Sequence, residues 1–271
     1  EVIGVETTIN SYTTRNVILA TGGLGYPKLG STGDGYELSS ELGHKITTLH
    51  PAMMPLITKE SWQSSCRADT IAKAQIKIDL PKAKKLKATG DLIFTSNGLR
   101  GPVVLDFARE ITPFLDKHNE VPILINMVKG KNEDDILQYL KKQTTITTNN
   151  NIIEQLNKLL PQSVSTQLCN LVGANTELTF NKLDGTTRDK LVKIIVNTPF
   201  TIIGHDGFKN AMITRGGVSL KQIEPKTMQS KIIKGLYFCG ELIDLDGPCG
   251  GYNLQWSFSS GYLAGCLYKA K

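Results

Sequence analysis

Two glycine-rich segments near opposite ends of the sequence each follow a short, continuous apolar run. Residues 16–20 precede Gly22 and Gly23, and residues 236–239 precede Gly240. Uninterrupted apolar runs of this length are typical of parallel strands covered on both faces. In open α/β sheets, ligands bind beyond the carboxyl ends of such strands. The pattern therefore predicts an α/β fold in which both ends of the chain contribute to one ligand crevice.

Each glycine-rich segment leads into a predicted helix. Residues 22–35 contain six glycines, and a helix is expected over 34–42. The second segment ends in Gly250 and Gly251, and a helix is expected over 253–268. Glycines at a helix N-terminus leave backbone N–H groups open to an anion or to a polarised carbonyl, such as the C2 oxygen of a flavin. Either motif alone also fits a tight turn without a ligand, and the two motifs together are more specific for a ligand site.

Acidic residues follow the second apolar run. Glu241 comes directly after Gly240, where a carboxylate can accept hydrogen bonds from the hydroxyl groups of a sugar. Asp244 and Asp246 are interpreted as solvated or capping residues of the following loop. Glu241 is therefore the acidic residue assigned to ligand binding.

The middle of the chain differs in its sequence pattern. Strands are expected over 74–80, 91–95 and 121–128, and helices over 134–142, 152–160 and 187–197. Residues 82–87 are interpreted as a solvated basic turn, because no aromatic residues are interleaved with the lysines, and 144–151 as an exposed polar loop. We expect a discontinuous domain of residues 1–52 and 211–271. Its insert, 53–210, has a β-rich part over about 53–130 and a helical part over about 131–197.

Composition excludes several classes of protein. The 271 residues are 40% hydrophobic and 21% charged, which is typical of a globular chain and not of a disordered one. No window approaches the roughly 18 apolar residues of a membrane span. The net charge of +6 is too mild to argue for a nucleic-acid partner. We therefore expect neither a membrane nor a nucleic acid as partner.

Cysteine and histidine spacing argues against a metal site. The five cysteines form no CxxC pair, and the four histidines show no HxxxH or HExxH spacing. Isolated thiols indicate a reducing compartment, so a cytoplasmic location is expected. Cys249, His50 and Arg215 each have a structural interpretation beside a possible role in redox, acid–base or anion-binding chemistry.

At this point the motifs resemble a known family. Residues 16–23 and 30–36 resemble the second FAD-contacting stretch of fumarate-reductase-like flavoproteins. Residues 235–241 and 250–256 are similar to the BaiN/YhiN-type bacterial flavoproteins, described as NAD(P)- and FAD-dependent oxidoreductases or as aminoacetone-oxidase-like. Three further stretches share that similarity, namely 94–102, 214–218 and 225–231.

The resemblance implies a Rossmann-like FAD domain interrupted by an insert with a small β-barrel-like part and a helical part. It implies FAD as cofactor and NAD(P)H as a possible electron donor, and it leaves the catalytic residues unassigned. Glu241 would hold the ribityl hydroxyls, and the start of the last helix would face the isoalloxazine. The implied cofactor-binding residues are Thr21, Gly22, Gly23, Gly33, Asp34, Gly240, Glu241, Gly250, Gly251, Tyr252, Asn253 and Leu254.

The sequence departs from the family pattern in two places. It opens at Glu1 in mid-pattern, without the strand–GxGxxG–helix unit that binds pyrophosphate, so we expect a fragment or a processed chain. Ser96 stands where relatives often have histidine. Three functions therefore stay open. They are an FAD-dependent oxidoreductase of a small organic substrate with NAD(P)H or oxygen, a catalytically silent binding or assembly module, and a flavin-dependent RNA-modifying enzyme.

Overall fold

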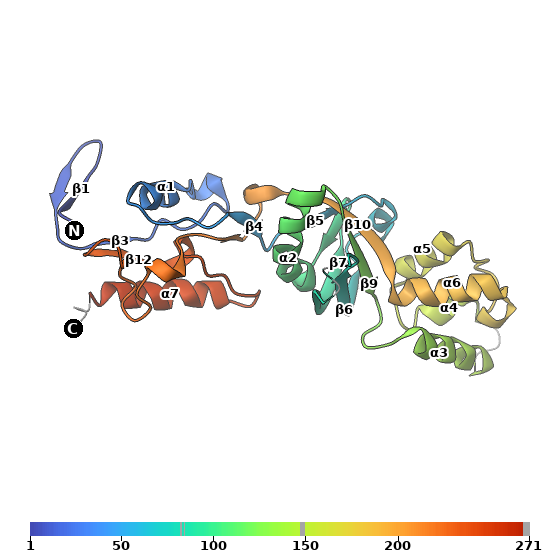
Figure 1. The fold of residues 1–271 in the computed structure, drawn as a ribbon. Coiled ribbons are helices and arrows are strands. Elements are labelled where there is room, and N and C mark those ends of the chain that lie inside the picture. Colours follow the sequence, from blue (N-terminus) through green and yellow to red (C-terminus); the bar gives the residue numbers. More distant parts are fainter. Residues whose placement is uncertain (82, 84, 147–149, 268–271) are drawn as a thin grey trace. The chain divides into compact units, whose positions relative to one another are not determined.

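The computed structural model describes residues 1–267 except 82, 84 and 147–149. The chain forms two compact units (Figure 1). The discontinuous unit comprises Glu1–Met54 and Asp206–Lys271, and the insert unit comprises Pro55–His205. The boundaries expected from sequence, 52/53 and 210/211, lie two and five residues away from these.

The discontinuous unit is built from short paired strands and two helices. β1 (Gly4–Glu6) and β2 (Ser11–Thr13) form an antiparallel hairpin, and β4 (His50–Ala52) pairs with β11 (Ile213–Arg215). β3 (Val17–Leu19) pairs in parallel with β12 (Leu236–Phe238). The helices are α1 (Asp34–Glu41) and α7 (Tyr252–Gly265). The α/β class expected from the apolar runs is confirmed.

The parallel pair β3–β12 brings the two glycine-rich segments to one edge. The backbone N–H of Cys239 continues the pairing by donating to the carbonyl of Leu19 over 3.1 Å. All three residues of β12 are buried, whereas Ile18 of β3 is 38% exposed. The expectation that residues 16–20 form a strand covered on both faces is therefore wrong. The apolar run predicted a parallel strand correctly but overestimated how far that strand is buried.

The insert unit contains a closed six-stranded barrel, which confirms the expected β-barrel-like part. Its strand order is β10-β5-β8-β7-β6-β9. Large apolar side chains such as Ile76, Phe94, Ile123 and Phe200 fill the interior. The six strands are β5 (Leu56–Thr58), β6 (Thr70–Ile78), β7 (Lys87–Phe94), β8 (Gly98–Arg100), β9 (Val121–Asn126) and β10 (Thr198–His205).

Helices accompany the barrel, and one of them was not expected there. α2 (Pro102–His118) packs against β6 and β7, inside the stretch predicted to be β-rich. Its buried positions, including Val104, Phe107 and Ile111, recur at helical spacing. Pro102 at its first turn costs no hydrogen bond, because N–H groups there have no helical partner. The other helices are α3 (Glu133–Ile146), α4 (Ile152–Leu156), α5 (Gln162–Val172) and α6 (Gly185–Val196).

Several predicted bounds need correction. α3 continues to Ile146, so the loop expected over 144–151 is partly helical, and its residues 147–149 lie outside the described part. α4 ends at Leu156, before the predicted stop at 160. Lys87 begins β7 instead of ending the basic turn, while 82 and 84 lie outside the described residues. None of the helices in the described ranges is both long and apolar enough to cross a bilayer.

Candidate functional site

Glu241 and Thr214 join the two glycine-rich segments in the discontinuous unit. Glu241 follows β12, and its Oε1 accepts a hydrogen bond from the backbone N–H of Thr214 over 2.5 Å. Thr214 lies in β11, is 2% exposed, and its Oγ1 accepts a hydrogen bond from Leu24 N over 2.8 Å. A single buried threonine therefore fixes the position of the carboxylate relative to the first glycine-rich segment.

Position 23 requires a glycine because its backbone lies close to Glu241 and Thr214. A Cβ at position 23 would collide with the Glu241 carboxylate and with Thr214 Oγ1. Gly35 in α1 lies similarly close to Thr21, because a Cβ at position 35 would collide with the Thr21 hydroxyl. These glycines let β3, α1 and the Glu241 turn approach each other closely.

Burial controls the ionisation of the site. It raises the pKa of the Glu241 carboxyl above its usual value, against the hydrogen bonds from Thr214, which lower it. Burial also raises the pKa of Tyr36 far above its usual value, with a further contribution from the Glu241 charge. The Tyr36 hydroxyl donates to the Glu241 carbonyl over 3.2 Å. The tyrosine therefore stays neutral and supports the turn that carries Glu241.

Gly240 is held by α7. Its N–H donates to Ser260 Oγ over 2.9 Å, and its carbonyl accepts from Trp256 Nε1 over 3.0 Å. Its φ of 69° lies in the left-handed region that favours glycine. Gly240 therefore anchors the end of β12 on α7 with both of its backbone polar groups.

Asn253 organises the loop before α7. Its Oδ1 accepts from Gly247 N over 2.8 Å, and its Nδ2 donates to Gly247 O over 2.9 Å. Gly251, with φ 89°, is the N-cap of α7, and no described side chain caps the first turn. The amide of Asn253 is thus used within the protein, while the backbone N–H groups of the first turn stay open to a ligand.

One cavity of about 330 Å³ lies at this helix start. Of the residues predicted from sequence, it is lined by Glu241, Gly250, Gly251, Asn253 and Leu254. The remaining lining residues were not predicted as site residues, and they are Met53, Met212, Ile213, Pro248, Cys249 and Ser257. The cavity therefore combines a carboxylate, an open helix N-terminus and apolar walls.

The other predicted residues lie outside this lining. Gly23 and Thr21 have the packing roles given above, and Gly22 is half-buried with φ 75°. Gly33 is the N-cap of α1 with φ 90°, which places Asp34 in the exposed first turn and not at the cap. Tyr252 is 62% exposed.

Thr214 is the most important residue that prediction from sequence missed as a site residue. It lies in the stretch 214–218 that carried the resemblance, so the motif was visible but its role was not. Its contact with Leu24 spans a sequence separation of 190 residues, which no local pattern reveals.

The residues present fit a flavin nucleotide. Glu241 offers an acceptor for hydroxyl groups, the open start of α7 suits a polarised carbonyl, and Met53, Met212 and Leu254 offer apolar contact to a ring system. The fold and this site define an α/β protein with a nucleotide-type crevice at the carboxyl ends of its parallel strands.

The chain belongs to the HI0933-like protein Rossmann domain family, whose sequence model matches residues 1–267. This family binds FAD, and the membership confirms the resemblance seen in the sequence.

Three curated relatives are similar to most of this chain. A 3-dehydro-bile acid delta(4,6)-reductase of Clostridium scindens is 30% identical over 92% of this chain and 61% of its own length. A ribosomal RNA dihydrouridine synthase of Haemophilus influenzae is 31% identical over 92% of this chain and 59% of its own length. The enzyme of the same name from Escherichia coli is 26% identical over 91% and 58%. The chain thus spans about 60% of the length of these relatives.

Proposed function

We propose that this chain is part of an FAD-dependent oxidoreductase that uses NAD(P)H to reduce a small organic substrate. The observation that carries the proposal is the Glu241 carboxylate, fixed by Thr214 and Gly23 beside the open start of α7. The relative named as a bile-acid reductase supports reduction of an organic molecule. The scattered cysteines, which form no CxxC pair in the sequence, support a cytoplasmic location.

When bound, the flavin supplies the hydride chemistry, and the protein supplies binding and orientation. Glu241 would accept hydrogen bonds from the ribityl hydroxyls. The backbone N–H groups of the first turn of α7, together with Gly250 and Gly251 before it, would donate to a flavin carbonyl. Met53 and Leu254 would offer the ring an apolar surface.

A flavin titration tests the proposal. The purified chain is titrated with FAD, and quenching of flavin fluorescence is followed; NADH or NADPH is then added without oxygen and the flavin absorption band is recorded. Saturable FAD binding, followed by bleaching of the band, supports the oxidoreductase. Binding without bleaching by either nucleotide removes NAD(P)H as donor. A chain that takes up no FAD contradicts the proposal and favours the catalytically silent binding module.

A second candidate function is flavin-dependent reduction of uridine in RNA. Two relatives are named ribosomal RNA dihydrouridine synthases. Most of the net charge lies in one unit. The insert unit holds 20 of the 31 basic and 15 of the 25 acidic residues, so it carries +5 of the net charge of +6. Dihydrouridine formed in ribosomal RNA by the enzyme, and absent with the Glu241→Ala variant, would distinguish this substrate from a small molecule.

A further inference from the structure

Two lysines face each other on the outside of the insert barrel. Lys77 of β6 pairs directly with Lys87 of β7. Ile76 and Ile78 on either side of Lys77 point into the barrel core, so Lys77 lies on the outer face. Like charges directly opposite each other across two strands are destabilising. An anion lying across both lysines would relieve this repulsion.

Amide side chains continue this surface across three strands. Gln75 of β6 is paired with Thr89 of β7 on one side and with Asn126 of β9 on the other. These three residues and the two lysines form one outward-facing patch, which we call the lysine–amide face: Gln75, Lys77, Lys87, Thr89 and Asn126.

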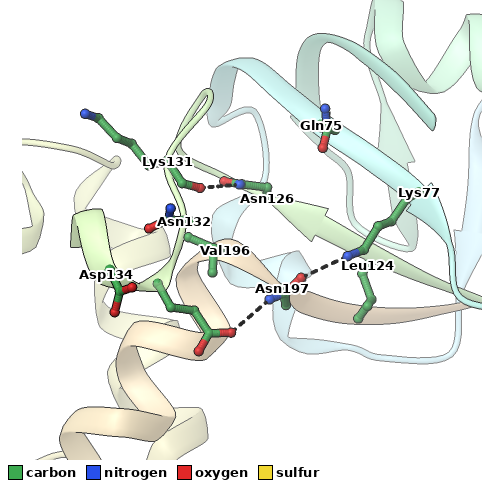
Figure 2. Close-up of a pocket in the computed structure, with 10 residues that line it drawn as sticks. Gln75, Lys77, Leu124, Asn126, Lys131, Asn132, Asp134, Val196 and Asn197 are labelled. Atoms are coloured by element: carbon green, nitrogen blue, oxygen red, sulfur yellow. Dashed lines mark hydrogen bonds between the residues drawn. The ribbon is translucent and has the colours of Figure 1, made fainter. Parts of the chain in front are cut away.

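A cavity of about 470 Å³ adjoins the lysine–amide face (Figure 2). Lys77 Nζ donates to Asn197 Oδ1 over 3.2 Å, and Asn197 Nδ2 donates to Glu133 Oε1 over 3.3 Å. Asn126 Nδ2 donates to the carbonyl of Lys131 over 2.8 Å. Figure 2 shows these bonds joining β6, β9, the start of α3 and the residue after α6. The polar groups are therefore held in place before any ligand arrives.

The chemistry of the cavity selects among possible ligands. Glu133 and Asp134 line it beside Lys77 and Lys131, so its interior is balanced in charge and does not suit a free phosphate or a lipid headgroup. Leu124 and Val196 add apolar surface. Asn126 and Asn197 use both ends of their amides in hydrogen bonds within the protein. Among the lining residues, Gln75 therefore offers the amide donor and acceptor that match the edge of an unstacked base. The phosphates then lie outside, along Lys77 and Lys87.

We propose that the lysine–amide face binds single-stranded RNA, with the backbone across Lys77 and Lys87 and one unstacked base in the adjoining cavity. This inference rests on the second candidate function above, since it supplies the surface on which an RNA substrate docks. The sequence alone led us to expect no nucleic-acid partner, because the net charge is mild and no aromatic residues are interleaved with the lysines of 82–87. Strand register, which that expectation did not include, brings the lysines and amides together.

The test measures binding of a fluorescent single-stranded RNA by anisotropy at several salt concentrations. The double variant Lys77→Gln/Lys87→Gln should bind about tenfold more weakly. The slope of log affinity against log salt should fall by about 1.4, since each lost phosphate contact contributes about 0.7. The matched control is Lys141→Gln/Lys142→Gln, which removes the same charge from exposed positions of α3 and should bind as the unaltered chain. Equal weakening by both double variants would overturn the proposal.

A second variant tests the base cavity. Gln75→Ala should reduce the difference in affinity between uridine and adenosine homopolymers, while the salt slope stays unchanged. A chain that binds both homopolymers and heparin equally well, with or without Gln75, would reduce the face to a general polyanion surface and overturn the base-binding part. The FAD titration is run on the same variants. RNA binding by a chain that takes up no FAD would contradict the oxidoreductase and support the docking surface. FAD uptake by a chain that binds no RNA would support the oxidoreductase and contradict the docking surface.

Discussion

The α-carbon of Gly23 lies against the carboxylate of Glu241, and these residues come from the two glycine-rich segments at opposite ends of the chain. Thr214 donates its backbone N–H to Glu241, and its hydroxyl oxygen accepts from the N–H of Leu24, the residue after Gly23. The carboxylate is therefore held by Thr214 and confined on the side of Gly23. The site depends on a backbone approach that a single methyl group would prevent.

Gly23→Ala should weaken FAD binding about tenfold or more. The added Cβ must displace the Glu241 carboxylate, and overpacking of this kind costs about 1–3 kcal/mol, where about 1.4 kcal/mol is a tenfold change in affinity. The measurement is the dissociation constant from quenching of flavin fluorescence. Gly261→Ala is the control, because a Cβ there meets no atom within 4 Å. Identical FAD affinities for the two variants would contradict the role of Gly23.

The raised pKa of Glu241 predicts a dependence of stability on pH. A carboxyl whose pKa is higher in the folded protein binds its proton more tightly there than in the unfolded chain. The free energy of unfolding therefore falls as the pH rises from the ordinary value of 4.5 through the raised pKa. Glu241→Gln keeps an acceptor for Thr214 N and removes the titration. The variant should gain stability relative to the unaltered chain at about pH 7 and lose that advantage below about pH 4.

The two tryptophans make this measurable for one unit at a time. Trp256 lies in α7 of the discontinuous unit, and Trp62 lies in the insert unit. In a Trp62→Phe background, urea unfolding followed by tryptophan fluorescence reports the discontinuous unit. A stability difference between Glu and Gln that does not change with pH would refute the burial of an ionised carboxylate.

Asn253→Ala should loosen the loop before α7. The substitution removes both hydrogen bonds to Gly247, each contributing about 1 kcal/mol. Hydrogen exchange at the Gly247 amide should accelerate about tenfold, and FAD affinity should fall with it because the helix start loses its fixed position. Gln255→Ala is the control, since its side chain bonds only to Ser259 among the described contacts. Unchanged protection at Gly247 would show that the loop is held by other contacts.

The elements that sequence predicted best are those with local patterns. The apolar runs and their glycines gave β3, β12, α1 and α7, because strand, turn and helix signals there lie within a few residues of each other. α2 was missed, although its buried positions follow a helical period, and it contains Pro113, a residue that usually ends a helix.

The parts that could not be predicted depend on distant partners. β5 and β8 have three residues each and exist because they close the barrel, which no pattern within either strand encodes. Thr214 became a site residue through Leu24 and Glu241, both far away in sequence. The like-charged pair Lys77–Lys87 arises only from the register of β6 and β7.

Gly98→Ala tests how the barrel closes. β5 and β8 share only the pairs Leu56–Leu99 and Ile57–Gly98, and a Cβ at Gly98 would collide with the carbonyl of Leu56. The variant should lose about 1–3 kcal/mol of the free energy of unfolding of the insert unit, because the strands must separate to admit the methyl group. Fluorescence of Trp62 in a Trp256→Phe background follows that unit during urea unfolding.

Gly204→Ala is the matched control for Gly98. Gly204 pairs with the same Ile57 from the other side, on β10, but a Cβ there meets only Ile57 Cδ1 at 3.9 Å, an ordinary contact. It should therefore leave the stability of the insert unit nearly unchanged. If both variants destabilise the unit equally, the cost comes from replacing glycine in a strand and not from the close approach of β5 and β8. That result would show that Gly98 has no special role in barrel closure.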